Sequence, residues 1–170
     1  DVTVTSTRGH LTDNYNPTNK TINLSESVYA SNSIAAAAVA AHETGHAIQD
    51  AYGYAPLRVR SALVPVISFA SQWSFLLIIV GIILINTMPA IFWAGIALIA
   101  LSAIFSVITL PVEYNASNRA MQWLEASGTL HGEALQQAGT ALRWAARTYL
   151  VAALSAIATL LYYIGFARRD

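Results

Sequence analysis

The sequence contains no cysteine and little charge, and each shortage excludes a class of protein. Without cysteine there is no disulfide framework, no thiolate zinc site and no cysteine nucleophile. Charged residues make up 11% of the 170 residues, whereas a typical soluble domain has about 25%. The net charge is zero and no basic cluster is larger than the pair Arg168-Arg169, so we do not expect a nucleic-acid-binding protein.

Charge is also missing from two long stretches of the chain. Residues 61–112 and 148–167 contain no Asp, Glu, Lys, Arg or His. We therefore predict three transmembrane helices, at residues 63–85, 88–110 and 149–166, of which the first two form a helical hairpin. The alternative is a buried hairpin in a soluble helical protein. We disfavour it because a soluble chain of this size must cover its surface with polar groups.

The polar N-terminal region has the pattern of a small sheet followed by a helix. Residues 2–5 and 21–24 alternate as strands do, and the stretch between them is rich in turn-forming residues, which predicts a β-hairpin or small sheet. Helix-capping serines then precede an alanine-rich segment, which predicts a helix from residue 34 to about residue 50. The expected fold class is a mainly α membrane protein with this small N-terminal sheet and helix.

The expected organisation is a single functional unit with two parts. Residues 1–56 hold the sheet and the alanine-rich helix, and residues 57–170 form the transmembrane region. Within the latter, residues 113–147 read as a helical segment on the cytoplasmic side, with breaks near Gly128 and Gly132. The side is assigned from arginines near the ends of the spans, because cytoplasmic loops carry more of them. One side has five (Arg58, Arg60, Arg119, Arg143 and Arg147), and the other has Arg168 and Arg169.

Residues 42–46 form an H-E-x-x-H motif on the predicted helix. Positions i and i+4 share one helical face, so the imidazoles of His42 and His46 can reach the same cation. Glu43 is then placed to act as a general base towards a zinc-activated water. The alternative is two surface histidines beside a solvated glutamate, but so apolar a helix would solvate these groups poorly. We predict one zinc ion per chain.

A catalytic zinc site needs a third protein ligand and an open position for water. Because cysteine is absent, only His10, His131 or a carboxylate can serve. We favour Glu113, which directly follows the long uncharged stretch, because a lone carboxylate at a membrane boundary is costly unless it is paired or metal-bound. The alternative is an interfacial glutamate paired with Arg119 or Arg58.

This combination of an H-E-x-x-H helix and a downstream glutamate resembles gluzincin membrane metallopeptidases. More specifically, the chain resembles the YugP-like neutral zinc metallopeptidases of bacterial membranes, and the likeness runs over nearly its whole length. The segments that carry it are GHLTD (9–13), YNP (15–17), LS (24–25), AAHE (40–43), GHAIQ (45–49), GYAPL (53–57), RSALVP (60–65) and PVEYNAS (111–117).

The resemblance implies a multi-pass zinc endopeptidase of the bacterial inner membrane that acts on a polypeptide substrate. It implies His42, His46 and Glu113 as zinc ligands and Glu43 as catalytic base. It also implies a membrane helix ahead of the sheet. Because the sequence begins at Asp1, we expect it to be a fragment that starts after that helix.

The chain departs from the broader group of related peptidases at one position. In those peptidases an Asp four residues after the glutamate ligand supports a zinc-bound histidine, and here that position is Ser117. A metal-bound histidine normally donates its other N–H to a neighbour. Ser117, Asn115, Asn118 and Asp50 are the candidates for that role.

Several further readings stay open at this point. Tyr114 is either an oxyanion donor or an interfacial aromatic residue, and the strand at 21–24 could hold a peptide by β-addition. A different function is a non-catalytic membrane metalloprotein or adaptor, in which His10 or His131 completes a structural metal site. An intramembrane protease of the site-two type is disfavoured, because no apolar span surrounds His42. Two histidines and a carboxylate also suit iron.

Overall fold

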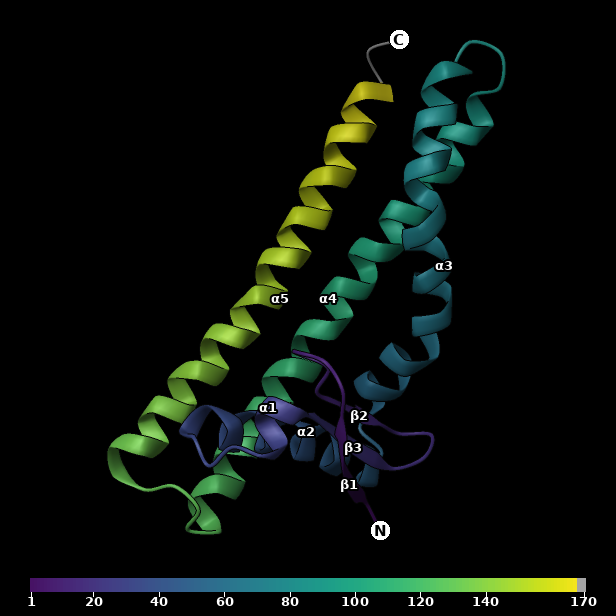
Figure 1. Cartoon of the computed structure of the whole chain (residues 1–170). Helices are drawn as coiled ribbons and strands as arrows, with labels where there is room; N and C mark the ends of the chain where they lie inside the picture. Colours follow the sequence, from purple (N-terminus) through teal and green to yellow (C-terminus); the bar gives the residue numbers. More distant parts are fainter. Residues whose placement is uncertain (168–170) are drawn as a thin grey trace. The chain divides into compact units, whose positions relative to one another are not determined.

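The computed structural model describes residues 1–167, which are mostly helical and carry one small sheet (Figure 1). This confirms the predicted fold class. Arg168 and Arg169, which were used to assign the membrane orientation, lie outside the described residues. The elements in chain order are β1 (Thr3–Thr7), β2 (Asn14–Asn16), β3 (Thr21–Ser25), α1 (Glu26–Tyr29), α2 (Ile34–Ala51), α3 (Ala55–Ile83), α4 (Pro89–Ala126) and α5 (Gly132–Ala167).

The chain divides into two compact units. The first contains residues 1–58 and 111–148, and the second contains residues 59–110 and the chain from Tyr149 onward. Helices α4 and α5 each contribute to both units, so the first unit holds the sheet, α1, α2, the C-terminal part of α4 and the N-terminal part of α5.

The sheet of the first unit has three strands in the order β1-β3-β2. β1 runs parallel to β3 and β2 runs antiparallel to it. The stretch that we predicted as turn therefore contains a strand, β2. Asn14 is held in the strand by a hydrogen bond that Asn23 donates across the sheet (3.0 Å), and the ring of Tyr15 packs on the apolar cluster around Ile22.

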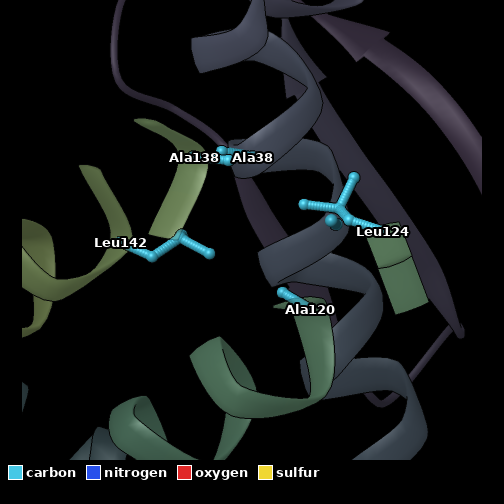
Figure 2. Packing of buried hydrophobic residues seen from close by; sticks show 6 residues of the cluster. Ala38, Ala120, Leu124, Ala138 and Leu142 are labelled. Atoms are coloured by element: carbon cyan, nitrogen blue, oxygen red, sulfur yellow. The ribbon is translucent and has the colours of Figure 1, made fainter. Parts of the chain in front are cut away.

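Helix α2 begins where the capping serines predict, with Ser33 Oγ accepting from Ala36 N (3.2 Å). Its small side chains are buried on two faces. Ala47 packs with Ile22 and Leu24 of the sheet. Ala38 and Ala41 pack in a second cluster with Ala120 and Leu124 of α4 and with Ala138 and Leu142 of α5 (Figure 2). Alanine therefore lets α2 lie between the sheet and the other helices at short distance.

Helix α4 does not end at Pro111, where we expected the second span to stop. It continues without interruption to Ala126 (Figure 1), although proline lacks the N–H that would bond to Val107 O. The reason is a row of side chains at i+4 spacing beyond the proline, all with no exposed surface. The burial of this row outweighs the lost hydrogen bond, which explains why the helix passes through the proline. The row consists of Val112, Ala116, Ala120 and Leu124.

The second unit contains the apolar segments. Helices α3, α4 and α5 are each long and apolar enough to cross a membrane. The α3–α4 hairpin is tight because Gly81 lies directly against the backbone of Phe92. Phe92 packs with Ile78 and Ile96, and Tyr163 of α5 lies edge-on to it at 6.5 Å between ring centroids. The three predicted spans are thus confirmed as apolar helices, but their bounds differ: α3 begins earlier and ends at Ile83, α4 begins at Pro89 and ends later, and α5 begins earlier than predicted.

Candidate metal and catalytic site

His42 and His46 lie one helical turn apart on α2, as the motif predicts. Their rings are 4.8 Å apart between centroids and nearly perpendicular, at 84°. The Nδ1 atom of His46 faces Gln49 and the Nδ1 atom of His42 faces Ser117. Each ring therefore turns its Nε2 atom towards the same space beside the helix.

Glu113 of α4 reaches into that space from the other side. Its Oε2 atom lies 3.1 Å from His42 Nε2 and 3.7 Å from His46 Nε2. The three residues offer ligand atoms that all lie within 4.8 Å of one another, and they form the one such group found among the described residues. Glu113 is 1% exposed, so its charge is removed from water and must be compensated inside the protein.

The spacing of these atoms suits a small divalent cation. A tetrahedral zinc ion with bonds of about 2.0–2.1 Å places neighbouring ligand atoms about 3.3 Å apart. The two nitrogen–oxygen distances, 3.1 and 3.7 Å, lie on either side of this value. Two imidazoles and one carboxylate are also a donor set that zinc accepts, and they leave a fourth position for water.

Gly45 allows the two helices to come this close. A Cβ atom at this position would collide with the carbonyl oxygen of Ala116 and lie 3.0 Å from its carbonyl carbon. Any side chain at residue 45 would push α2 away from α4. Gly45, the second x of the H-E-x-x-H motif, thus sets the distance between the histidines and Glu113.

The Nδ1 atoms of both histidines meet neutral groups. Ser117 Oγ lies 3.2 Å from His42 Nδ1, as we expected for one of the candidate supports. Gln49 Oε1 lies 3.0 Å from His46 Nδ1, and we did not anticipate this residue. The signal was present, because Gln49 follows His46 by three residues and so lies on the same helical face. Asn115 joins indirectly, by accepting from Gln49 Nε2 (3.0 Å), whereas Asp50 accepts from the hydroxyl of Tyr15 (2.8 Å).

Glu43 lies beside the same group and is 8% exposed. The pKa of Glu43 is raised above its ordinary value, mainly because the side chain is buried and also because of the nearby charge of Glu113. The charges of His46 and His42 and a hydrogen bond from the backbone of Tyr15 lower this pKa, but by less. Burial lowers the pKa of His46, but the hydrogen bond and charge of Glu113 raise it by more, so the net shift is upward. Four ionisable groups are therefore coupled in one poorly hydrated site.

The remaining candidates fall outside this group. His10 and His131 are exposed and do not belong to the three-residue group. Tyr114 is 40% exposed, which agrees with an interfacial aromatic side chain. Arg119 donates to Asn115 (2.8 Å). Glu113 lies within ion-pair distance of both histidines.

The strand at 21–24 cannot hold a substrate by β-addition, and this expectation was wrong. β3 is the central strand, paired with β1 on one side and β2 on the other, so its backbone groups are already used. The edge nearest Glu43 belongs to β2, through the backbone of Tyr15. Sequence alone could not reveal this, because β2 lies in a stretch of turn-forming residues.

Comparison with known proteins agrees with the geometry. A family described as "Putative neutral zinc metallopeptidase" matches residues 1–168. A relative from Bacillus subtilis (strain 168), "Putative membrane protease YugP", is 40% identical over 164 residues, which cover 96% of this chain and 72% of the relative. No solved structure matches the chain. Both the name of the relative and the three apolar helices indicate association with a membrane. The chain therefore belongs to the "Putative neutral zinc metallopeptidase" family.

Proposed function

We propose that the chain is a membrane-embedded zinc-dependent endopeptidase with His42, His46 and Glu113 as zinc ligands and Glu43 as general base. The observation that carries this proposal is the convergence of two histidine Nε2 atoms and one carboxylate oxygen beside a buried glutamate. Among the described residues no fourth His, Cys, Asp or Glu joins the group. This supports an open coordination position over a closed structural site.

The chemistry divides between the ion and the chain. Bound zinc supplies Lewis-acid chemistry, which polarises a carbonyl and makes water easier to deprotonate. The chain supplies the proton transfer: Glu43 removes a proton from the attacking water and passes it to the amine that leaves when the C–N bond breaks. Burial keeps the Glu43 carboxylate close to these groups and away from bulk water. Glu113 and the two imidazoles would hold the ion and would take no part in the proton transfer.

The reaction is proposed to take place at the membrane surface, on the cytoplasmic side given by the arginine distribution. Consecutive Cα atoms are about 3.8 Å apart, so the Cα atom of Glu113 lies within about 11 Å of that of Leu110. Leu110 ends the apolar part of α4, which belongs to the second unit. Because Leu110 and Glu113 are joined through the chain, this limit on their distance applies however the two units are arranged.

The replacement Glu43→Gln tests the general base. This variant keeps the size of the side chain and leaves all three proposed ligands in place, so zinc should stay bound while peptide hydrolysis is lost. The measurement is peptidase activity in detergent or proteoliposomes, together with metal content. An exposed glutamate on α5, Glu133, provides the matched control, because Glu133→Gln should leave activity unchanged. Full hydrolysis by the Glu43→Gln protein would remove this residue from the mechanism.

A further inference from the structure

Gln49 is fully buried and uses all of its polar atoms. Its Oε1 atom faces His46 Nδ1 at 3.0 Å, and its Nε2 atom donates to Val112 O (2.8 Å) and to Asn115 Oδ1 (3.0 Å). A primary amide has two N–H donors and one carbonyl acceptor. The three contacts therefore account for both protons of the amide and for its oxygen.

These contacts fix the orientation of the amide. Val112 O is a backbone carbonyl and can only accept, so the group facing it must be the NH2 end. The oxygen then faces His46 Nδ1 and can only accept. It follows that Nδ1 of His46 carries the proton, and the lone pair of the neutral ring sits on Nε2, the atom that faces Glu113.

From this geometry we infer that Gln49 is a positioning residue that sets the tautomer of His46 and ties it to α4 beside Glu113. The tie is direct, because Val112 and Asn115 lie on either side of Glu113 in the sequence. One buried side chain thus links a proposed ligand on α2 to the helix that carries another. The inference rests on the proposed function for its link to zinc, but not for the tautomer itself.

The choice of an amide in place of a carboxylate has a chemical consequence. A carboxylate at this position would face two acceptors, Val112 O and Asn115 Oδ1, with no proton to give them. The amide satisfies both acceptors and adds no negative charge to a site that already contains Glu43 and Glu113. His42 is supported in the same neutral way by the hydroxyl of Ser117.

The test combines two measurements on the full chain in detergent. The first is the tautomer of His46 in the metal-free protein, read from the ¹⁵N shifts of the ring. The pH is raised until these shifts no longer change, because Glu113 raises the pKa of His46. The second is the dissociation constant for zinc, measured by competition with a chelator. Gln136 on α5 is exposed, so Gln136→Met is the matched control for Gln49→Met.

The expected result is that the parent protein and the control hold His46 with its proton on Nδ1, and that Gln49→Met loses this preference. Loss of such a support typically weakens metal binding about 10- to 100-fold, and we expect that range for Gln49→Met and no change for Gln136→Met. A parent protein with the His46 proton on Nε2 would overturn the inference, whether or not the variant folds. So would a folded Gln49→Met protein that binds zinc as the parent does. If the parent has the expected tautomer but binds no zinc, the proposed function fails instead.

Discussion

The replacement Gly45→Ala should separate α2 from α4 and weaken metal binding. The added Cβ would meet backbone atoms of Ala116, which has no exposed surface and cannot rotate away as a side-chain tip could. One extra methyl group in a packed interior costs about 1–3 kcal/mol, and a backbone neighbour places this case near the upper end. Alanine recovers about 1 kcal/mol through its higher helix propensity. The net loss of stability should be about 2 kcal/mol.

Gly139→Ala is the matched control, because Gly139 is also a buried helical glycine of the first unit. There the new Cβ would lie 3.0 Å from Cε of Met121, the end of a flexible side chain that can move. The gain in helix propensity should dominate, and stability should stay equal or rise by up to about 1 kcal/mol.

The assay is thermal unfolding of both variants in detergent, without and with zinc, compared with the parent protein. We expect a lower Tm for Gly45→Ala, an unchanged or higher Tm for Gly139→Ala, and weaker zinc binding in Gly45→Ala alone. If Gly45→Ala unfolds at the temperature of the parent and binds zinc equally well, the reasoning that Gly45 sets the distance between the helices is refuted.

Two further predictions concern pH and metal removal. The phenol of Tyr15 should titrate near pH 12, because burial and the hydrogen bond to Asp50 raise its pKa from the usual 10.0 to about 12. The stability that the protonated phenol contributes is therefore fully present below pH 10 and is lost as the pH rises towards 12. The measurement is the difference in tyrosinate absorbance between the parent and Tyr15→Phe, and a difference that appears already at pH 10 would contradict the raised pKa. Chelation should lower the Tm of the parent, since free zinc at 100 times its Kd stabilises a protein by about 2.7 kcal/mol. The same treatment should leave the Tm of Glu113→Ala unchanged, and an equal drop in both proteins would show that the metal binds elsewhere.

Much of the fold could be predicted because apolar length and alanine content are strong local signals. The three apolar helices and the helix that carries His42 and His46 follow from them. The ends of the helices were less accurate. The burial of side chains beyond Pro111 carries α4 through a residue that would end an isolated helix, and this tertiary effect is not visible in local sequence.

The candidate site could be predicted only as far as residue chemistry alone determines it. The spacing of His42 and His46 and the isolated position of Glu113 led to a group that the structure brings together. The role of Gln49 was missed because an amide carries no charge and its contacts depend on the packing of α2 against α4. The edge strand β2 was missed for a similar reason, because it is held by long-range contacts of Asn14 and Tyr15 and not by strand-forming residues.

The most direct test of the account is anomalous scattering at the zinc edge from crystals of the purified protein, paired with metal analysis of the parent and of Glu113→Ala. We predict one zinc per chain, bound by Nε2 of His42, Nε2 of His46 and the carboxylate of Glu113, and a loss of that zinc in Glu113→Ala. An anomalous peak away from these three side chains, or the same zinc content in Glu113→Ala as in the parent, would contradict the account.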